Sequence, residues 1–240
     1  MSMARADDIR HNPGRDLVTS NLTRATGSTQ PESHSFMYNP SRFAISDLSL
    51  AQQLIAAHPL ALLIGPDADQ ESFVSHIPLS VNEDEQGWML EGHMARANPH
   101  WNWLSQQTTA LAVFSGPGAY VSPSHYEDLQ QVPTWNYLAV HVYGSLSLID
   151  EAQAKDALLK RLIARHEPAY ATQWRGLPEE YRQKMLQAIV GFRLRVTRWE
   201  GKFKLSQNRS AAERVRIKHS FGEGAAQEQE LAAWMQLLGL

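Results

Sequence analysis

The stretch NYLAVHVYGSLSL, residues 136–148, decides the fold. Aliphatic residues take every second position, apart from Gly144, and the positions between them are less apolar. Successive side chains of a β-strand point to opposite faces, so a period of two predicts a long strand with one buried face. The same alternation returns in VGFRLRVTRW, residues 190–199, with Arg193 and Arg195 at outward positions. We therefore expect two long amphipathic strands.

Shorter elements surround these two strands. Apolar or alternating runs bounded by turn residues predict further strands at 60–64, 72–81, 88–92, 110–114, 119–121 and 202–205. Gly116-Pro117-Gly118 is expected to turn the chain between two of them, and Gly201 to turn it before the last. Helices are expected at 50–57, 98–106, 150–167, 178–188 and 227–238, the first capped by Ser46 or Asp47 and the third by Asp150.

The order of these elements predicts one α+β domain. Because most of the strands are joined by tight turns, the sheet should be mainly antiparallel. Six or seven such strands usually close into a barrel, which removes the sheet edges. We expect a small barrel with peripheral helices from residue 37 to 222, followed by a C-terminal amphipathic helix at 223–240. Residues 1–36 are polar and show no periodicity, which favours a disordered extension.

Composition limits the functional classes. The chain has 240 residues, 43% hydrophobic and 20% charged, which is ordinary for a soluble globular protein. It contains no cysteine, which excludes disulfides, thiolate metal sites and cysteine nucleophiles, and fits a cytoplasmic location. We find no secretory signal and no membrane-spanning stretch. The net charge is -3, yet residues 193–218 carry nine Lys and Arg against two acids. That segment could meet a phosphate, a nucleic acid or an acidic partner, or could be a solvated strand face.

Common catalytic motifs are absent from the sequence. We find no phosphate-binding loop of the G-x-x-x-x-G-K-[ST] type, no G-x-G-x-x-G, no G-x-S-x-G and no H-E-x-x-H. The ten histidines lack the spacing of metal ligands, so no metal site is expected. No helix-turn-helix pair with a recognition helix is evident.

The densest group of functional residue types is GHMARANPHW, residues 92–101. We expect a strand to end here, Arg96 to lie in the loop and a helix to begin at Asn98. Free N–H groups at a helix start and the guanidinium of Arg96 would suit a phosphate, and His93 could donate as well. The alternative is a helix cap with a surface arginine.

Three further blocks place aromatic, hydroxyl or basic groups near strand ends. The first two, residues 116–123 and 133–137, could wall a flat heteroaromatic ligand or fill a barrel mouth. The third, residues 200–209, is a basic turn suited to a phosphate, a ribityl chain or a flavin edge.

Taken together, the blocks at 37–43, 59–63, 76–79, 92–101, 116–123, 133–144 and 200–209 resemble the PaiB-type family of FMN-binding negative transcriptional regulators. The resemblance covers about residues 37–222. It implies a flavin-type split β-barrel, similar to pyridoxamine 5′-phosphate oxidase, and a homodimer with FMN at the subunit interface.

The resemblance also implies a set of cofactor contacts. His93, Arg96 and Asn98 would hold the FMN phosphate, and one strand would pass under the flavin ring. The Ser-Arg-Lys pattern of the oxidases is Ala95-Arg96-Ala97 here, so one cation remains, and Lys202 or Lys204 could compensate. The complete set of candidate FMN contacts is Ser75, His76, Ile77, His93, Arg96, Asn98, Trp101, Tyr120, Thr134, Trp135, Lys204, Gln207 and Arg209.

Three functional hypotheses follow from the sequence. The first is an FMN-binding negative transcriptional regulator, with DNA left open as a direct partner. The second is an FMN-dependent oxidoreductase, in which the cofactor supplies the chemistry and His76, His141 or Tyr120 donates a proton. The third is a binding module without a cofactor that uses the barrel mouth as a ligand pocket.

Overall fold

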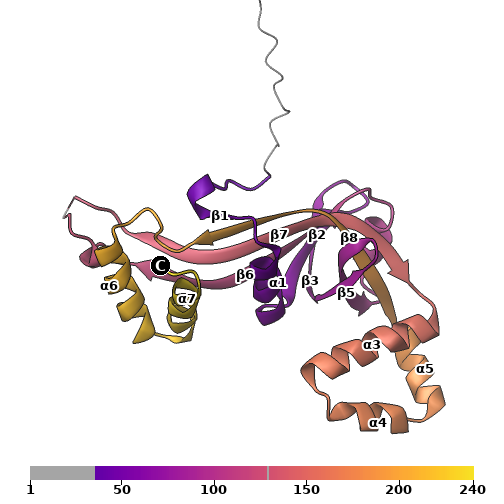
Figure 1. Ribbon diagram of the computed structural model, residues 1–240. Coiled ribbons are helices and arrows are strands. Elements are labelled where there is room, and N and C mark those ends of the chain that lie inside the picture. The colour runs from indigo at the N-terminus through magenta and orange to yellow at the C-terminus, as the bar shows by residue number, and fades with distance from the viewer. Residues whose placement is uncertain (1–35, 129) are drawn as a thin grey trace, which may run out of the picture. The chain divides into compact units, whose positions relative to one another are not determined.

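The computed structural model describes residues 36–128 and 130–240. In this part the chain forms an antiparallel sheet with helices around it (Figure 1). The strands are β1 (Ala44–Ile45), β2 (Leu60–Pro66), β3 (Ser72–Pro78), β4 (Ser80–Asp84), β5 (Gly87–Ala95), β6 (Ala110–Val121), β7 (Thr134–Ile149) and β8 (Ile189–Lys204). The helices are α1 (Leu48–Ala57), α2 (His100–Leu104), α3 (Ala152–His166), α4 (Tyr170–Gly176), α5 (Glu179–Gln187), α6 (Ala211–Gly222) and α7 (Ala226–Leu237), with 3₁₀ turns η1 (Ser41–Phe43) and η2 (Pro123–His125). The extension expected at 1–36 lies, apart from Phe36, outside the described residues.

The two long strands predicted from alternation are β7 and β8. They pair from Tyr137 opposite Lys204 to Ile149 opposite Gly191, and the whole sheet runs in the order β3-β2-β6-β7-β8-β5-β4, with β1 on β8. Strand β3 also packs against β5, which curls the sheet around its core. Phe114 and other inward residues of β6, β7 and β8 are fully buried there. The α+β class with a mainly antiparallel sheet is therefore confirmed.

Two expected turns are wrong. Strand β6 continues through Gly116 and Gly118 with a bulge, and β8 continues through Gly201. The glycines serve close packing instead, because a Cβ on Gly116 would lie 2.6 Å from Leu54 Cδ1 and one on Gly201 would lie 2.4 Å from Ile45 Cγ1. The single strand expected at 72–81 is divided into β3 and β4.

Residues 152–187, which we call the helical insert, connect β7 to β8. It contains α3 and α5 where helices were predicted, and also α4, which was not predicted. Asp150 does not cap α3, since no side-chain hydrogen bond caps this helix. Its carboxylate instead accepts from Arg96 and, at 3.2 Å, from Lys155 Nζ. Asp150, which the sequence suggested as a helix cap, therefore ties the helical insert to Arg96 at the end of β5.

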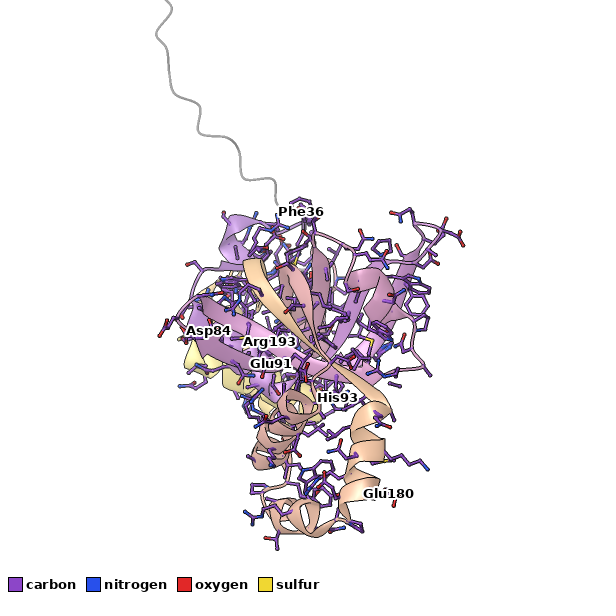
Figure 2. The ribbon with its side chains drawn as sticks, turned by 90° about the vertical axis from the view of Figure 1, so that its right-hand side faces the viewer. Phe36, Asp84, Glu91, His93, Glu180 and Arg193 are labelled. Atoms are coloured by element: carbon purple, nitrogen blue, oxygen red, sulfur yellow. The ribbon has the colours of Figure 1, made fainter. Side chains whose placement is uncertain are left out.

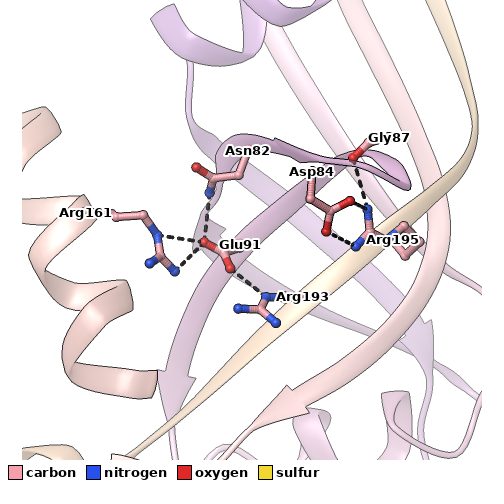
Figure 3. A network of polar contacts seen from close by, with 7 residues as sticks. All are labelled: Asn82, Asp84, Gly87, Glu91, Arg161, Arg193 and Arg195. Atoms are coloured by element: carbon pink, nitrogen blue, oxygen red, sulfur yellow. Dashed lines mark hydrogen bonds and ion pairs between the residues drawn. The ribbon is translucent and has the colours of Figure 1, made fainter. Parts of the chain in front are cut away.

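Glu91 on β5 forms a second tie between the sheet and the helical insert (Figure 2). Its side chain is only 6% exposed, and its two carboxylate oxygens accept from Arg161 of α3 and Arg193 of β8, each at 2.7 Å (Figure 3). Asn82 Nδ2 donates to the same carboxylate at 2.9 Å. A buried carboxylate requires such partners, and here they hold α3 against the barrel.

Helix α6 begins inside the basic segment 193–218, where no element was predicted beyond residue 205. It begins with a capping box: the Ser210 hydroxyl accepts from Glu213 N at 3.2 Å, and Glu213 Oε2 accepts from Ser210 N at 3.0 Å. The final helix expected at 227–238 is confirmed as α7, whose Trp234 packs edge-to-face on Phe203 with ring centroids 5.2 Å apart. No helix in the described part of the chain is long and apolar enough to cross a membrane.

Candidate functional site

A pocket of about 540 Å³ lies where the free ends of β7 and β8 meet the chain around η1. We call it the cationic pocket. Apart from Val132, its lining comes from three of the sequence blocks on which the family resemblance was argued, at 37–43, 133–144 and 200–209. The lining residues are Tyr38, Pro40, Arg42, Phe43, Val132, Pro133, Thr134, Asn136, Tyr137, Lys202, Lys204, Ser206, Asn208 and Arg209.

Two lysines of β8 place ammonium groups beside each other in this pocket. Lys202 and Lys204 are two residues apart on one strand, so both side chains point to the same face. Lys202 Nζ donates to the carbonyl of Tyr38 at 2.8 Å and lies 5.2 Å and 5.4 Å from the ring centroids of Tyr38 and Tyr137. Lys204 Nζ donates to the hydroxyl of Thr134. The lysines are thus held by neutral groups.

Arg209 and Arg42 add two guanidinium groups to the lining. Arg209 stacks on the ring of Tyr126, with 3.7 Å between its Cζ and the ring centroid, and donates to Gln131 Oε1 at 2.8 Å. Arg42 lies over Phe43 at 5.7 Å. Stacking on an aromatic face leaves guanidinium edges available to an acceptor.

The cationic pocket has no acidic residue in its described lining. Burial lowers the pKa of Lys204, the charge of Lys202 lowers it further, and Tyr137 opposes the shift. Two cations in one partly buried place repel each other, and a bound anion would relieve that repulsion. The electrostatics of the lining therefore favour an anionic ligand.

The turn after β8 is fixed by side chains that do not all reach the pocket. Asn136 and Ser206 are buried and bonded to each other at 3.0 Å, and Ser206 adopts a left-handed backbone with φ 64°. Gln207, a predicted contact, accepts from Leu205 N at 2.7 Å and donates to the carbonyl of Phe203. Gln207 shapes the turn that positions the pocket's cations.

Three residues at 93–98 were predicted to bind the FMN phosphate. Their side chains contact three different parts of the structure. The guanidinium of Arg96 pairs with Asp150 and donates to the carbonyl of Gln187 at 2.8 Å. His93 faces α3 beside Leu158, and burial lowers its pKa. Asn98 Oδ1 accepts from the N–H of His100, the first residue of α2, at 3.0 Å. A phosphate contact of these three residues stays a prediction.

Ser75 belongs to a buried network rather than to an open surface. Its hydroxyl lies 2.9 Å from His100 Nδ1 and accepts from Asn98 Nδ2 at 3.0 Å. Burial lowers the pKa of His100 to about 4, and its Nε2 has no hydrogen-bond partner. Trp101 Nε1 donates to the carbonyl of Arg96 at 3.0 Å. These contacts fasten α2 to β3.

The remaining predicted residues separate by exposure. Ile77 belongs to the core, whereas His76 is exposed on β3. Tyr120 and Trp135 are cross-strand neighbours on β6 and β7, 50% and 57% exposed, with ring centroids 6.3 Å apart. Trp135 follows Thr134 on β7, but neither aromatic side chain is part of the lining of the cationic pocket.

Of the predicted contacts, the structure brings Thr134, Lys204 and Arg209 together in the cationic pocket. Sequence reasoning did not select Tyr38 or Arg42, although Tyr38 stands in the Met37–Phe43 block that carried part of the resemblance. The sequence alone gave no sign that these two residues reach the pocket, because the block is brought there by the pairing of β1 with β8. In the described residues, no three acidic or histidine side chains gather to hold a metal ion.

The family model described as "Putative FMN-binding domain" matches residues 37–198. The chain belongs to this family. The Bacillus subtilis "Protease synthase and sporulation protein PAI 2" is 29% identical over 185 residues, which cover 75% of this chain and 87% of that protein. An uncharacterised protein of Aspergillus fumigatus is 29% identical over 236 residues, covering 77% and 90%.

Solved structures confirm the split-barrel fold of the FMN-binding domain. The FAD and heme binding protein of Mycobacterium smegmatis has a TM-score of 0.55 at 18% identity, over 72% of this chain and 78% of its own. The flavocytochrome Anf3 of Azotobacter vinelandii has a TM-score of 0.53 at 18% identity, over 67% and 69%. At such identities the likeness concerns the fold alone.

The residues of the cationic pocket fit an FMN molecule chemically. Clustered cations without acids suit a phosphate dianion. The rings of Tyr38 and Tyr137 suit contact with a flat heteroaromatic system, and the side chains of Thr134 and Asn208 can hydrogen-bond a polyol. The volume also falls within the range of about 300–1,000 Å³ that is usual for small-molecule pockets.

Proposed function

We propose that the protein is a cytoplasmic FMN-binding homodimer whose cationic pocket holds the FMN phosphate. The observation that carries the proposal is the gathering of Lys202, Lys204, Arg209 and Arg42 in one pocket whose described lining has no acid. Membership of the FMN-binding domain family supports the identity of the ligand. When bound, FMN supplies redox chemistry, and the chain's own residues bind and orient it.

The distribution of the candidate contacts supports the proposed homodimer. One group lies at the cationic pocket, and another, including His76 and Trp101, lies on β3 and around α2. A second copy could bring its His76 or Trp101 to the first copy's pocket, which would make the cofactor site composite. The exposed pair Tyr120 and Trp135, on β6 and β7, offers apolar surface for such an association. Sedimentation with and without FMN tests the dimer; a monomer in both samples would contradict it.

The FMN proposal is tested by an absorption spectrum before and after FMN is added and the protein desalted, followed by a titration of FMN fluorescence. Lys204→Met should weaken binding about tenfold or more, because a hydrogen bond to a charged group contributes about 1.5–3 kcal/mol. Lys184→Met changes an exposed lysine on α5 and serves as the matched control. Equal affinities in the two variants would refute the assignment of the pocket, and no binding by the unchanged protein would favour the cofactor-free binding module.

We propose negative regulation of transcription as the biological role. The name of the Bacillus subtilis relative refers to protease synthesis and sporulation, which favours a regulatory role. Within the basic segment 193–218, however, Arg193 and Arg195 are ion-paired with carboxylates of β5 and β4, and Lys202 and Lys204 line the cationic pocket. We therefore expect the regulator to act without this segment lying on DNA. A gel shift on candidate promoters at two salt concentrations tests this, since salt-sensitive binding lost in Lys218→Met would contradict it.

The alternative role is an FMN-dependent oxidoreductase. His141 and Glu200 are direct cross-strand neighbours on β7 and β8, between the cationic pocket and the middle of the sheet. Burial lowers the pKa of His141 while Glu200 opposes that shift, so this pair could hold and release a proton. Bleaching of bound flavin by NADH or NADPH under anaerobic conditions would support the enzyme. Failure of both, together with an FMN-dependent change in promoter occupancy, would support the regulator.

A further inference from the structure

A second cavity, of about 340 Å³, lies inside the helical insert between α3 and α4. We call it the insert cavity. It is lined by Lys160, Ile163, Ala171, Trp174 and Arg175. The insert joins β7 to β8 at Ile149 and Ile189 (Figure 1). The cationic pocket is lined by residues at the opposite ends of these strands, such as Thr134 and Lys204. The insert cavity is therefore separate from the proposed flavin site.

The wall of the insert cavity is apolar and fixed in place. Trp174 is 7% exposed, and its indole Nε1 donates to Asp156 Oδ1 at 2.8 Å. Ile163 and Ala171 complete the hydrocarbon lining, and the stems of long charged side chains add methylene groups to it. Because the indole is held by Asp156, the cavity is part of the folded insert and does not need to be opened by a ligand.

Of the two basic side chains that line the insert cavity, only one has an acidic partner in the described part of the chain. The carboxylate of Asp156 is shared by the Trp174 indole and Lys160 Nζ, which lies 2.6 Å away. Arg175 donates only to the hydroxyl of Thr172 at 3.3 Å, and it has no ion-pair partner among the described residues. One guanidinium at the rim is thus left uncompensated above an apolar cavity.

We propose that the insert cavity binds a small apolar carboxylate, with its hydrocarbon part against Trp174 and Ile163 and its carboxylate on Arg175. The apolar lining favours a hydrocarbon group, and the uncompensated guanidinium selects a carboxylate over an alcohol or an amine. Helix α3, which forms one wall, also carries Arg161 to the buried Glu91 of β5. A ligand in the insert cavity therefore contacts the same helix that fastens the insert to the barrel.

Calorimetric titration of the full-length protein with octanoate tests the proposal, with 1-octanol as the uncharged probe. Octanoate should bind with one site per chain, and octanol should bind about tenfold more weakly, because it lacks the charge-assisted pair. Arg175→Gln should weaken octanoate by about tenfold and leave octanol unchanged. Gln173→Ala, on the exposed side of α4, is the matched control and should bind octanoate as the unchanged protein does.

Ala171→Leu separates a filled cavity from a damaged fold. Its added carbons should occupy the insert cavity and abolish octanoate binding, while the melting temperature stays the same or rises. The FMN titration should be unaffected in this variant. No binding of octanoate, equal binding of octanol, or undiminished binding in both Arg175→Gln and Ala171→Leu would overturn the proposal.

Discussion

Acid should destabilise this protein through His100, the fully buried histidine that begins α2. Burial lowers its pKa from the ordinary value of 6.5 to about 4. Between these two values the unfolded chain binds a proton at His100 that the folded chain does not bind, so stability rises with pH and is lost as the pH falls. At about 1.4 kcal/mol per pH unit, the loss is about 2 kcal/mol by pH 5 and ~3 kcal/mol by pH 4.

Urea denaturation of the unchanged protein and of His100→Asn, between pH 7.5 and 4.5, measures this contribution. Asparagine supplies an amide oxygen near the position of Nδ1, so the hydrogen bond with Ser75 can persist while the titrating group is removed. His93 and His141 titrate in both proteins, and their contributions cancel in the difference. The unchanged protein should lose about 2 kcal/mol more than the variant by pH 5. Parallel stability curves for the two proteins would refute the reasoning.

Further predictions concern packing, a buried ion pair and ligand binding. Gly144→Ala should cost about 3 kcal/mol in a thermal melt, because its Cβ would lie 2.1 Å from a backbone oxygen of β8; an unchanged melting temperature would contradict this. Glu91→Gln should cost about 1–2 kcal/mol in urea denaturation, since its arginine partners are half-exposed, whereas Asp84→Asn at the surface should cost clearly less; an equal loss in the two variants would contradict this. FMN affinity should fall as pH rises toward 10, because Lys204 loses its proton below the ordinary pKa of 10.5; a flat fluorescence titration profile would count against a phosphate contact there.

Local patterns predicted the elements of the barrel well where they were strictly periodic. The alternation at 136–148 and 190–199 identified β7 and β8, because one face of each strand is buried. The prediction was wrong at Gly116 and Gly201, where glycine was interpreted as a turn signal. These glycines make room for α1 and β1, and that need arises only once distant segments pack together.

The candidate site was harder to predict because it depends on long-range pairing. Lys204 and Thr134 are 70 residues apart in sequence and meet only through the pairing of β8 with β7. Arg96 shows the reverse case: its position beside a helix start suggested an anion site, and the structure pairs its guanidinium with Asp150. Sequence showed which residues carry suitable chemistry, but not which partner each would meet.

The pairing of β7 with β8 has a consequence for how the barrel is assembled. The helical insert is a local unit that brings Ile149 next to Gly191, so the ladder can start there with a modest loop-closure cost. Pairing then extends residue by residue toward Tyr137 and Lys204, the pair most distant in sequence. The end of the β7–β8 strand pair that carries the cationic pocket therefore forms last. A ligand of the cationic pocket would therefore bind only chains in which the pairing of β7 with β8 is complete. Such a ligand would slow unfolding more than it speeds folding.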